Sequence, residues 1–386
     1  MKKIFSFLLF FSILPLIHLC NSFIARSILP FYYPIAHTGQ LNSPGMISRR
    51  FIGEEPLVIY PSQHHHKSSQ GGGEKKTRFI VQSDVCPHMG AMLHKGWISP
   101  NGGIHCPYHG FEFNENGMFC NIPNPIQKYH RHESLVKLDT FPVYTKFGYL
   151  FIPPSIHLPC YSPNPPKKNP LNQNQTLSVL DVPFKPYFPP EAKNPDFRCI
   201  QGSRQIGQYQ DIVTENLLDM LHISYVHSFG SRLTPIPYDV KYNKIHDWGF
   251  RTRFLYCPNQ GTISTDVGKV TSVVVENEFY MPSTTITRVT AGNIVKTVHT
   301  FTTPGPGKSC TLYWRIYRNF WKDRYFPTFD GIGDVLLRYL MEKTINEDQD
   351  ILSKIYEDRR NSLFTTKYDV SIRKYRDMIR RFQYSS

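Results

Sequence analysis

The pattern of hydrophobic and polar positions divides the chain into two β-rich parts. In the first part, short apolar runs of the β type alternate with turns rich in Gly, Pro and Asn; the runs are PLVIY (56–60), TRFIVQ (77–82), FEFNENGMF (111–119) and GYLFI (148–152). The tetrapeptide NENG inside the third run predicts a hairpin turn. Residues 154–173 are rich in Pro, Asn and Lys, which is typical of a linker. We therefore expect a β domain over 31–153 and a linker over 154–178.

The second part, residues 179–386, combines longer β runs with helical segments. The β runs cover 250–257, 269–281, 284–289, 294–303 and 310–320. A helix is predicted before them, over about 211–227, and another after them, from about Asp334 to Arg360. The second helix carries an apolar stripe at steps of three and four, formed by Leu337, Met341, Ile345, Leu352 and Ile355. The pattern as a whole predicts an α+β fold.

The first 22 residues read as a targeting segment. Two lysines precede an apolar run from Ile4 to Leu19, and the small residues Cys20 and Ser22 follow it, which is the order of a secretory signal peptide. An uncleaved anchor is the alternative. Phe23 directly after the expected cleavage point resembles the leaders of proteins sent to plastids of secondary origin. The expected location is such a plastid, and the alternative is the ER or another endomembrane.

Composition narrows the function classes. The net charge is +14 at pH 7, but the basic residues are scattered and no nucleic-acid-binding motif occurs, so a nucleic-acid partner is not expected. Eight cysteines in 386 residues are too dilute for a secreted disulfide scaffold. The basic stretch SIRKYRDMIRRF (371–382) predicts a docked terminal helix, with peripheral contact to a membrane or to an acidic ferredoxin as the alternative.

Two short Cys–His couples stand close together in the first part, in CPHMG (86–90) and CPYHG (106–110). Their donors Cys86, His88, Cys106 and His109 are residue types that bind zinc in structural sites. An iron–sulfur cluster is the preferred interpretation, because each Pro- and Gly-supported loop can give one thiolate to one iron and one imidazole to the other. The spacing resembles the Rieske pattern, in which two His replace two Cys on one iron of a 2Fe–2S centre.

A second group of metal-binding residue types lies in TENLLDMLHISYVHSFG (214–230). Asn216, Asp219 and His222 follow one another at steps of three, so they share one face of a continuous helix. His222 and His227 would point about 140° apart on an ideal helix of 3.6 residues per turn. Their convergence on one metal requires the helix to loosen before His227. The alternative is an amphipathic helix with two incidental histidines.

The carboxylate of a two-His, one-carboxylate iron site is expected from INEDQDILSKI (345–355). Asp348 falls on the apolar stripe, whereas Glu347 and Asp350 lie off it and are expected to face solvent. A carboxylate on a buried helix face needs a partner, and a metal is a suitable one. The alternative is that Asp348 pairs with a buried Arg or with a backbone donor.

With these motifs in place, the chain resembles the Rieske non-haem iron oxygenases over most of its length. The resemblance implies an N-terminal Rieske all-β domain followed by a helix-grip (START-like) antiparallel β-sheet catalytic domain around an apolar pocket. It implies that a 2Fe–2S cluster is held by Cys86, His88, Cys106 and His109, and that a mononuclear non-haem Fe(II) is held by His222, His227 and Asp348.

The same resemblance implies how the two metal sites work together. Family members are usually head-to-tail trimers, in which Asp219 would connect His222 with the cluster ligand His109 of a neighbouring subunit. Asn216 would support the iron site. A ferredoxin or reductase would supply electrons, and dioxygen would be used to hydroxylate or demethylate an apolar small molecule.

Neighbours of the cluster motif favour a low reduction potential. Respiratory Rieske proteins carry a disulfide between the two loops and a Ser after the second Gly, whereas this chain has Ala91, Tyr108 and Phe111 at these positions. Fewer hydrogen bonds to sulfur lower the potential. A low potential suits electron delivery to an oxygen-activating iron.

The substrate is left open by the sequence. As a family member directed to a plastid, the chain is similar to the chlorophyllide a oxygenase and pheophorbide a oxygenase branch, which implies a chlorophyll-type tetrapyrrole as the substrate. A sterol or other polycyclic substrate is the alternative. Two further alternatives are a Rieske electron-transfer protein without oxygenase activity and an import-associated redox protein of the plastid.

Overall fold

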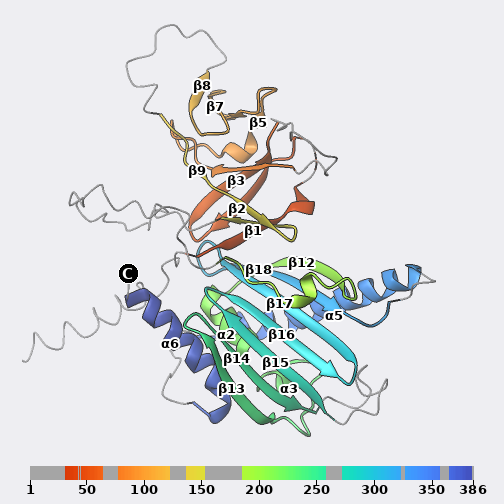
Figure 1. Ribbon diagram of the computed structural model, residues 1–386. Coiled ribbons are helices and arrows are strands. Elements are labelled where there is room, and N and C mark those ends of the chain that lie inside the picture. Colours follow the sequence, from red (N-terminus) through yellow and green to blue (C-terminus); the bar gives the residue numbers. More distant parts are fainter. Residues whose placement is uncertain are drawn as a thin grey trace, which may run out of the picture.

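The computed structural model describes residues 31–41, 43, 45–63, 77–121, 136–152, 185–257, 272–322, 327–356 and 365–384. The expected targeting segment (1–22) and linker (154–178) lie outside these residues. Figure 1 shows two parts, a smaller β-rich part and a larger part built on one broad sheet. Among the described residues, no helix is both long and apolar enough to cross a membrane.

The smaller part consists of short antiparallel strands in three sheets. Their orders are β1–β11–β10, β2–β3–β4–β9 and β5–β6–β7–β8. Asn114 shapes the predicted hairpin turn, because its Oδ1 accepts hydrogen bonds from the backbone N–H groups of Asn116 and Met118. The bounds are β1 Tyr33–His37, β2 Ser48–Ile52, β3 Glu55–Pro61, β4 Phe79–Ser83, β5 Trp97–Ile98, β6 Ile104–His105, β7 Glu112–Phe113, β8 Phe119–Asn121, β9 Thr140–Phe141, β10 Tyr144–Lys146 and β11 Tyr149–Ile152.

The larger part is a seven-stranded antiparallel sheet in the order β12–β18–β17–β16–β15–β14–β13. Only the connection from β12 to β13 leaves the sheet, and it carries the helices α2 and α3. The five predicted β runs all occur as strands. The bounds are β12 Arg198–Ile206, β13 Tyr238–His246, β14 Gly249–Tyr256, β15 Val273–Tyr280, β16 Thr284–Ala291, β17 Ile294–Pro304 and β18 Cys310–Arg318.

Helices cover one face of this sheet, which we call the inner face (Figure 1). They are α2 Gln210–Leu218, α3 Ile223–Val226, α5 Pro327–Leu352 and α6 Val370–Tyr384. The predicted stripe of α5 packs on the sheet, since Leu337, Met341, Ile345 and Leu352 are buried in one cluster with Trp314 of β18. The terminal helix α6 is docked, with Tyr375 and Met378 buried. The predicted α+β class with a β-rich first part is confirmed.

Two helix predictions need correction. The segment expected as one helix over 211–227 is broken, because α2 ends at Leu218 and α3 begins at Ile223. The Oδ1 of Asp219 accepts a hydrogen bond from the Leu221 N–H at 2.7 Å, and this local bond competes with helix continuation. The long helix begins at Pro327, seven residues before the expected start at Asp334, and it ends at Leu352, before the expected end at Arg360.

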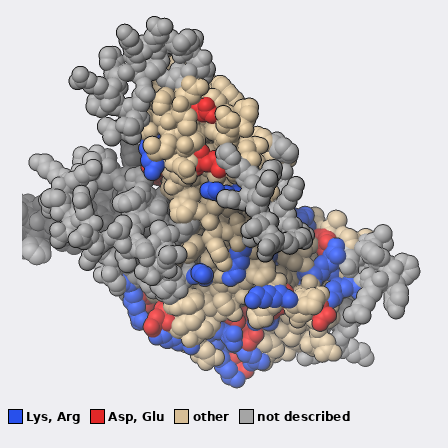
Figure 2. Space-filling model, turned by 45° about the horizontal axis from the view of Figure 1, so that its top comes forward, with Lys and Arg blue, Asp and Glu red and all other residues tan. Residues whose placement is uncertain are grey.

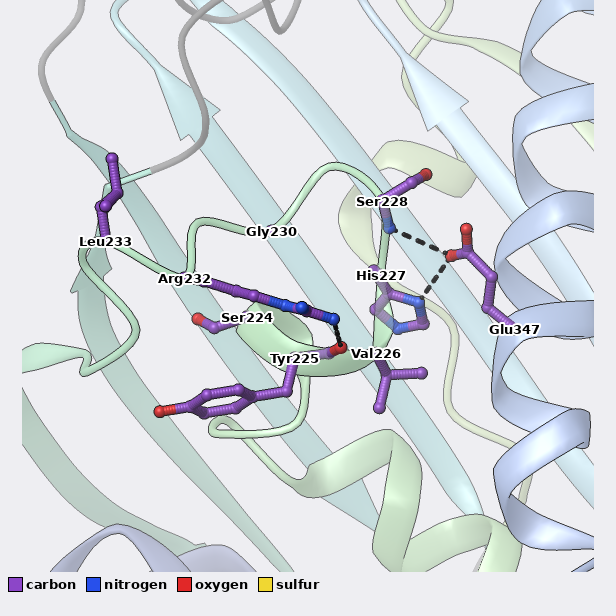
Figure 3. A pocket seen from close by; sticks show the side chains of 9 residues that line it. All are labelled: Ser224, Tyr225, Val226, His227, Ser228, Gly230, Arg232, Leu233 and Glu347. Atoms are coloured by element: carbon purple, nitrogen blue, oxygen red, sulfur yellow. Dashed lines mark hydrogen bonds and ion pairs between the residues drawn. The ribbon is translucent and has the colours of Figure 1, made fainter.

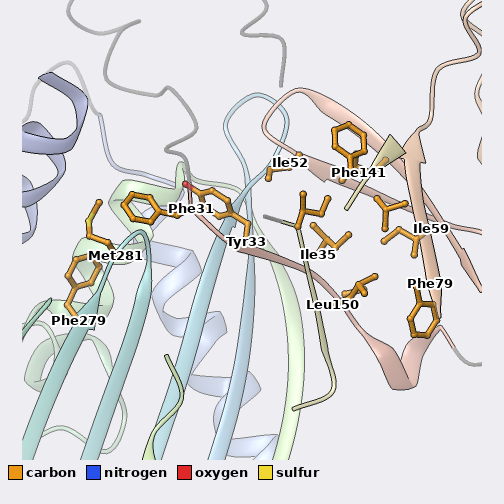
Figure 4. Close-up of a cluster of buried hydrophobic side chains, with 14 of the residues drawn as sticks. Phe31, Tyr33, Ile35, Ile52, Ile59, Phe79, Phe141, Leu150, Phe279 and Met281 are labelled. Carbon is orange, nitrogen blue, oxygen red and sulfur yellow. The ribbon is translucent and has the colours of Figure 1, made fainter. Parts of the chain in front are cut away.

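The outer face of the sheet packs against the smaller part. Phe301 of β17 and Tyr313 of β18 form a buried cluster with Tyr149 and Phe151 of β11. A second cluster joins the two parts through the inner face, where Phe31 and Tyr33 lie near Met281 and near Phe279 of β15, which packs with Leu218 of α2 (Figure 4). The apolar area buried in these clusters favours a fixed arrangement of the two parts.

Charged side chains are spread over the surface. On the face in Figure 2, Lys and Arg are interleaved with Asp and Glu along the lower part of the molecule. Several basic side chains are paired, as in the contact of the Arg376 guanidinium of α6 with Glu215 of α2 at 2.6 Å. The net positive charge is therefore not gathered into one stripe on this face.

Candidate metal centres

Two loops of the smaller part have matching geometry around their cysteines. In the first loop, the Cys86 carbonyl accepts from the Gly90 N–H and the Cys86 N–H donates to the Ala91 carbonyl, both at 2.9 Å. In the second loop, Cys106 makes the same two bonds, with Gly110 at 2.9 Å and Phe111 at 2.8 Å. Gly90 and Gly110 have φ angles of 75° and 73°, which glycine adopts without strain.

The four predicted donors lie together at the tip of these loops. The thiol groups of Cys86 and Cys106 are in contact, and the ring centroids of His88 and His109 are 4.9 Å apart. Donors of the same type thus sit side by side, with one of each pair from each loop. The thiols are buried, at 2% and 1% exposure, whereas both imidazoles are exposed.

This donor set fits a two-iron cluster with thiolates on its inner side and imidazoles on its outer side. Burial raises the pKa of the Cys86 thiol to about 11, with a further contribution from Cys106. A thiol in this environment becomes a thiolate when a cation takes the place of its proton.

The second predicted group of donors also converges. The Nε2 atoms of His222 and His227 are 3.2 Å apart, and the Oδ1 atom of Asp348 lies 3.6 Å and 3.4 Å from them. Three donors about 2.1 Å from one metal and at right angles to one another would be about 3 Å apart. The three atoms therefore have the spacing of one triangular face of an octahedral site.

The break between α2 and α3 lets the two histidines converge. His222 caps the single turn of α3, and His227 ends it with an extended backbone at ψ 138°. Asp348 reaches the same point from α5, where it continues the apolar stripe. The predicted loosening of the helix is present, but it occurs before His222 as well as at His227.

The electrostatics of the three groups fit a bound cation. Asp348 Oδ1 is buried and has no hydrogen-bond partner among the described residues, and burial raises the pKa of the Asp348 carboxyl. Burial and the neighbouring His227 lower the pKa of His222 to about 3. The imidazole is therefore neutral near pH 7, which is the form that binds metals.

Asn216 and Asp219 lie on either side of this group. The Asn216 side chain is hydrogen-bonded to Asp348, and Asp219 Oδ2 is 3.9 Å from Nδ1 of His222. Asp219 stands beyond the end of α2, so it does not share a continuous helical face with Asn216 and His222 as expected. Burial raises the pKa of the Asp219 carboxyl.

Glu347 is the residue that the sequence interpretation placed wrongly. Its side chain is only 20% exposed, and Oε2 lies 3.1 Å from Nδ1 of His227. The same oxygen accepts from the Ser228 N–H at 3.4 Å (Figure 3). Asp350, in contrast, is 67% exposed and pairs with Lys354, as expected for a residue off the stripe.

A cavity of about 390 Å³ opens beside His227 and Glu347. Tyr225, Arg232 and Leu233 line it together with the loop around Gly230 (Figure 3). The Arg232 guanidinium donates to the Tyr225 carbonyl at 3.4 Å, and Tyr225 is 56% exposed. His227 is therefore reached from this side by a surface hollow.

Sequence families match both parts of the chain. Residues 31–142 match the Rieske 2Fe-2S domain, and residues 209–383 match the C-terminal domain of the vanillate O-demethylase oxygenase. The first match contains both Cys–His loops, and the second contains His222, His227 and Asp348.

Curated relatives match a limited stretch of the chain. This chain is 32% identical over 163 residues to the chloroplastic protochlorophyllide-dependent translocon component 52 of Arabidopsis thaliana. The matched stretch covers 41% of this chain and 25% of the relative. This chain is 26% identical over 185 residues to the chloroplastic pheophorbide a oxygenase of Oryza sativa subsp. japonica, covering 46% and 31%. The chain therefore spans about a quarter to a third of the length of these relatives.

Solved structures share the fold along nearly the whole chain. The crystal structure of dicamba monooxygenase bound to dicamba matches with a TM-score of 0.67 at 18% identity, over 92% of this chain and 97% of that chain. The Pseudomonas putida CBB5 NdmA structure with caffeine matches with a TM-score of 0.66 at 17% identity, over 94% and 92%. At this identity the likeness concerns the fold alone.

Proposed function

The chain belongs to the Rieske non-haem iron oxygenases, and we propose that it uses dioxygen to hydroxylate or demethylate an apolar polycyclic substrate. Its cofactors are a Rieske 2Fe–2S cluster and a mononuclear non-haem iron, as in its family. We assign the cluster to Cys86, His88, Cys106 and His109, in a domain of residues 31–153. We assign the iron to a domain of residues 179–386, through His222, His227 and Asp348.

The observation that carries this proposal is the triangle of donor atoms with sides of 3.2, 3.4 and 3.6 Å. A protein that only transfers electrons through its cluster has no need of a second group with this spacing. Two neutral imidazoles and one carboxylate leave three positions of an octahedral iron open, and the metal supplies the site where dioxygen and electrons meet.

Residues around the triangle hold its members in place. The amide of Asn216 is bonded to the Asp348 carboxylate, and the Glu347 carboxylate accepts from Nδ1 of His227. Both contacts fix the orientation of a ligand. The exposed imidazoles of His88 and His109 give the cluster a way to exchange electrons with another protein surface.

We further propose a homotrimer in which Asp219 connects His222 with His109 of a neighbouring subunit. Asp219 lies 3.9 Å from His222 and is 27% exposed at its side chain, so one oxygen can face a partner. The electron donor in this proposal is a ferredoxin or a reductase. The net charge of +14 on this chain favours a donor with an acidic surface. We also propose that the protein contacts a membrane peripherally.

The proposed substrate is a chlorophyll-type tetrapyrrole, and the proposed location is a plastid of secondary origin reached by a signal peptide. Relatives whose names specify the chloroplast, including a pheophorbide a oxygenase and a flavonoid 8-hydroxylase, support the location. The flavonoid 8-hydroxylase is named for a different substrate class, so a sterol-type or other polycyclic molecule is the alternative substrate.

A second candidate function is a plastid redox protein without oxygenase activity. The observation that favours it is the 32% identity to a relative named as a translocon component. This candidate predicts a cluster that is reduced and oxidised but no consumption of dioxygen that depends on His222.

The test is anaerobic purification followed by iron and sulfide analysis of the wild type and the His222→Ala variant. We expect three iron atoms and two sulfides per wild-type chain, and the loss of one iron and of oxygen uptake with pheophorbide a in the variant. Unchanged oxygen uptake in His222→Ala would contradict the oxygenase proposal. One zinc and no acid-labile sulfide would contradict both candidates.

A further inference from the structure

The proposed iron ligands His222 and His227 stand at the two ends of α3, which is a single turn of four residues. A helix this short is not stable by itself in water, because one turn fixes several backbone angles for few hydrogen bonds. Its shortest backbone bonds join the His222 carbonyl to the N–H groups of Tyr225 and Val226, both at 2.9 Å. The separation of the two imidazoles therefore depends on contacts that hold α3 from outside.

One such contact comes from the sheet. Tyr256 is the last residue of β14 and is 4% exposed. Its ring packs in a buried cluster with Met220 and Val275, and Ile223 of α3 packs against that cluster. Its hydroxyl lies 2.8 Å from the hydroxyl of Ser224, which is 1% exposed. The sheet therefore reaches α3 at a residue that stands between the two histidines.

The Tyr256 hydroxyl is the centre of a directed chain of hydrogen bonds. The Ser231 N–H donates to it at 3.0 Å, and the Ser224 hydroxyl donates to the Pro235 carbonyl at 3.0 Å. Because the hydrogen of the Ser224 hydroxyl is used in that bond, the Tyr256 hydroxyl donates to Ser224. Each hydroxyl then donates one bond and accepts one, an arrangement in which neighbouring bonds strengthen one another.

This chain of bonds joins α3 to the loop that follows it. Both ends of the chain, Ser231 and Pro235, belong to that loop, whereas Ser224 belongs to α3 and Tyr256 to β14. Part of the same loop lines the hollow beside His227 (Figure 3). The loop, the short helix and the sheet therefore meet at one phenolic oxygen.

We propose that Tyr256 is a positioning residue of the mononuclear iron site. Its hydroxyl holds α3 and the following loop in place on the sheet, and this fixes the separation of the His222 and His227 imidazoles. Asp348 comes from α5, so the same contact sets where the two imidazoles stand relative to the carboxylate. The inference rests on the proposed function and adds a residue that acts on the metal through α3.

The test is Tyr256→Phe, which removes the hydroxyl and keeps the buried ring. The full-length protein with its cluster is titrated with Fe(II) against a chelator under anaerobic conditions. We expect Fe(II) to bind about 3- to 10-fold more weakly than in the wild type, because one or two hydrogen bonds that hold the ligands in place are lost. Acid-labile sulfide should be unchanged, because both Cys–His loops lie in the smaller part.

A spectroscopic signature separates positioning from stability. Nitric oxide bound to high-spin Fe(II) gives an EPR signal whose rhombicity depends on the geometry of the ligands, and the oxidised cluster is EPR-silent. We expect a shifted or broadened signal in Tyr256→Phe and in Ser224→Ala, which interrupts the same chain of bonds. The double variant should bind Fe(II) like the weaker single variant, since both substitutions act on one chain.

The matched control is Tyr280→Phe. Tyr280 is 3% exposed on the neighbouring strand β15, and its hydroxyl donates to the Glu278 carboxylate at 2.8 Å. This variant also loses a buried phenolic hydrogen bond, so its Tm should fall, but its Fe(II) affinity and EPR signal should be those of the wild type. In the metal-free full chain, amide hydrogen exchange over residues 222–233 should be faster in Tyr256→Phe and unchanged in Tyr280→Phe.

The outcomes separate this inference from the proposed function. Wild-type Fe(II) affinity and rhombicity in Tyr256→Phe would overturn the inference whatever its Tm, as would equal changes in Tyr280→Phe. If Tyr256→Phe does not fold, Ser224→Ala decides in the same way. A wild type that binds no mononuclear iron would contradict the proposed function, whereas a wild type that binds it like Tyr256→Phe would contradict only the role of Tyr256.

Discussion

The Oε2 atom of Glu347 lies 3.1 Å from Nδ1 of His227. Nδ1 is the ring nitrogen that does not face Asp348. The other nitrogen, Nε2, faces Asp348 Oδ1 at 3.4 Å. The carboxylate thus holds the proton on Nδ1 and leaves the lone pair of Nε2 for a metal. Consecutive acidic residues of α5 serve the same histidine from its two sides.

Removal of the Glu347 carboxylate should weaken the mononuclear iron site. Partners of metal-bound imidazoles change metal affinity by about 10- to 100-fold when they are mutated. We expect Glu347→Ala to lose iron to a chelator in this range, whereas Glu347→Gln, which keeps an acceptor oxygen, should retain part of the affinity. The measurement is iron content after dialysis against graded chelator, with the EPR signal of the reduced cluster as an internal standard.

Asp350→Asn is the control for this prediction, because Asp350 lies on the same helix but is 67% exposed. It should bind iron like the wild type. Equal iron retention by Glu347→Ala and Asp350→Asn would show that the contact with His227 has no effect on the metal.

Cys86→Ser should abolish the cluster without emptying the iron site. Cys86 is buried against Cys106, and no other described cysteine lies in either loop. Visible absorbance and acid-labile sulfide should both fall to background, while one iron per chain remains bound. Cys120→Ser, at an exposed cysteine of the same part, should leave the spectrum unchanged. A spectrum retained in Cys86→Ser would contradict the assignment of the ligand.

His299 should make the protein sensitive to acid. Burial, together with the charge of Arg315, lowers the pKa of this imidazole to about 3, although the nearby backbone of Tyr187 acts in the opposite direction. The unfolded chain binds a proton near pH 6.5 and the folded one does not, so stability is fully present above pH 6.5 and falls as the pH drops towards 3.

His299→Leu removes the proton that the unfolded chain binds at this position and the folded protein does not. Urea unfolding measured from pH 7 to pH 4 should give a slope of stability against pH that is smaller by up to about 1.4 kcal/mol per pH unit than in the wild type. Identical slopes for the two proteins would mean that the buried imidazole does not contribute to acid unfolding.

The ion pair of Arg376 and Glu215 should anchor α2 to α6. Two nitrogens of Arg376 donate to the two carboxylate oxygens at 2.7 and 2.6 Å, and Glu215 is 8% exposed. Arg376→Met should destabilise the protein by about 3–5 kcal/mol, since it removes the cation that binds both oxygens of a buried carboxylate. The double variant Arg376→Met, Glu215→Leu should recover part of the loss in thermal unfolding. Additive losses in the two single variants would contradict a coupled pair.

The periodicity of apolar residues in α5 correctly predicted which face of the helix is buried, and with it the position of Asp348. Asp348 follows the apolar stripe of α5 to the sheet, and the five long β runs were recognised by composition and alternation. The prediction that Glu347 faces solvent was wrong, because the apolar stripe indicates which face of α5 packs on the sheet but not which other segment lies beside the helix. The turn at His227 and Ser228 comes close to the flank of α5 and covers a residue that the pattern leaves to solvent.

The break between α2 and α3 shows a second limit of the sequence pattern. The spacing of Asn216, Asp219 and His222 is compatible with a continuous helix, so the pattern alone favours one. The backbone departs from it because the Asp219 side chain bonds to the Leu221 N–H. A polar side chain that can bond to its own backbone leaves both conformations open until the surroundings select one.

The position of the proposed iron ligands on helices, and not on strands, has a consequence for how proteins of this fold diverge. The proposed iron ligands stand on α3 and α5 or at their ends, whereas none of them stands on a strand of the sheet. Replacement of a strand residue that does not bond to α3 or α5 therefore leaves the segments that carry the proposed ligands as they are. Descendants of one ancestral gene can then acquire new specificities by few changes, each viable by itself, while the oxidising centre is inherited intact.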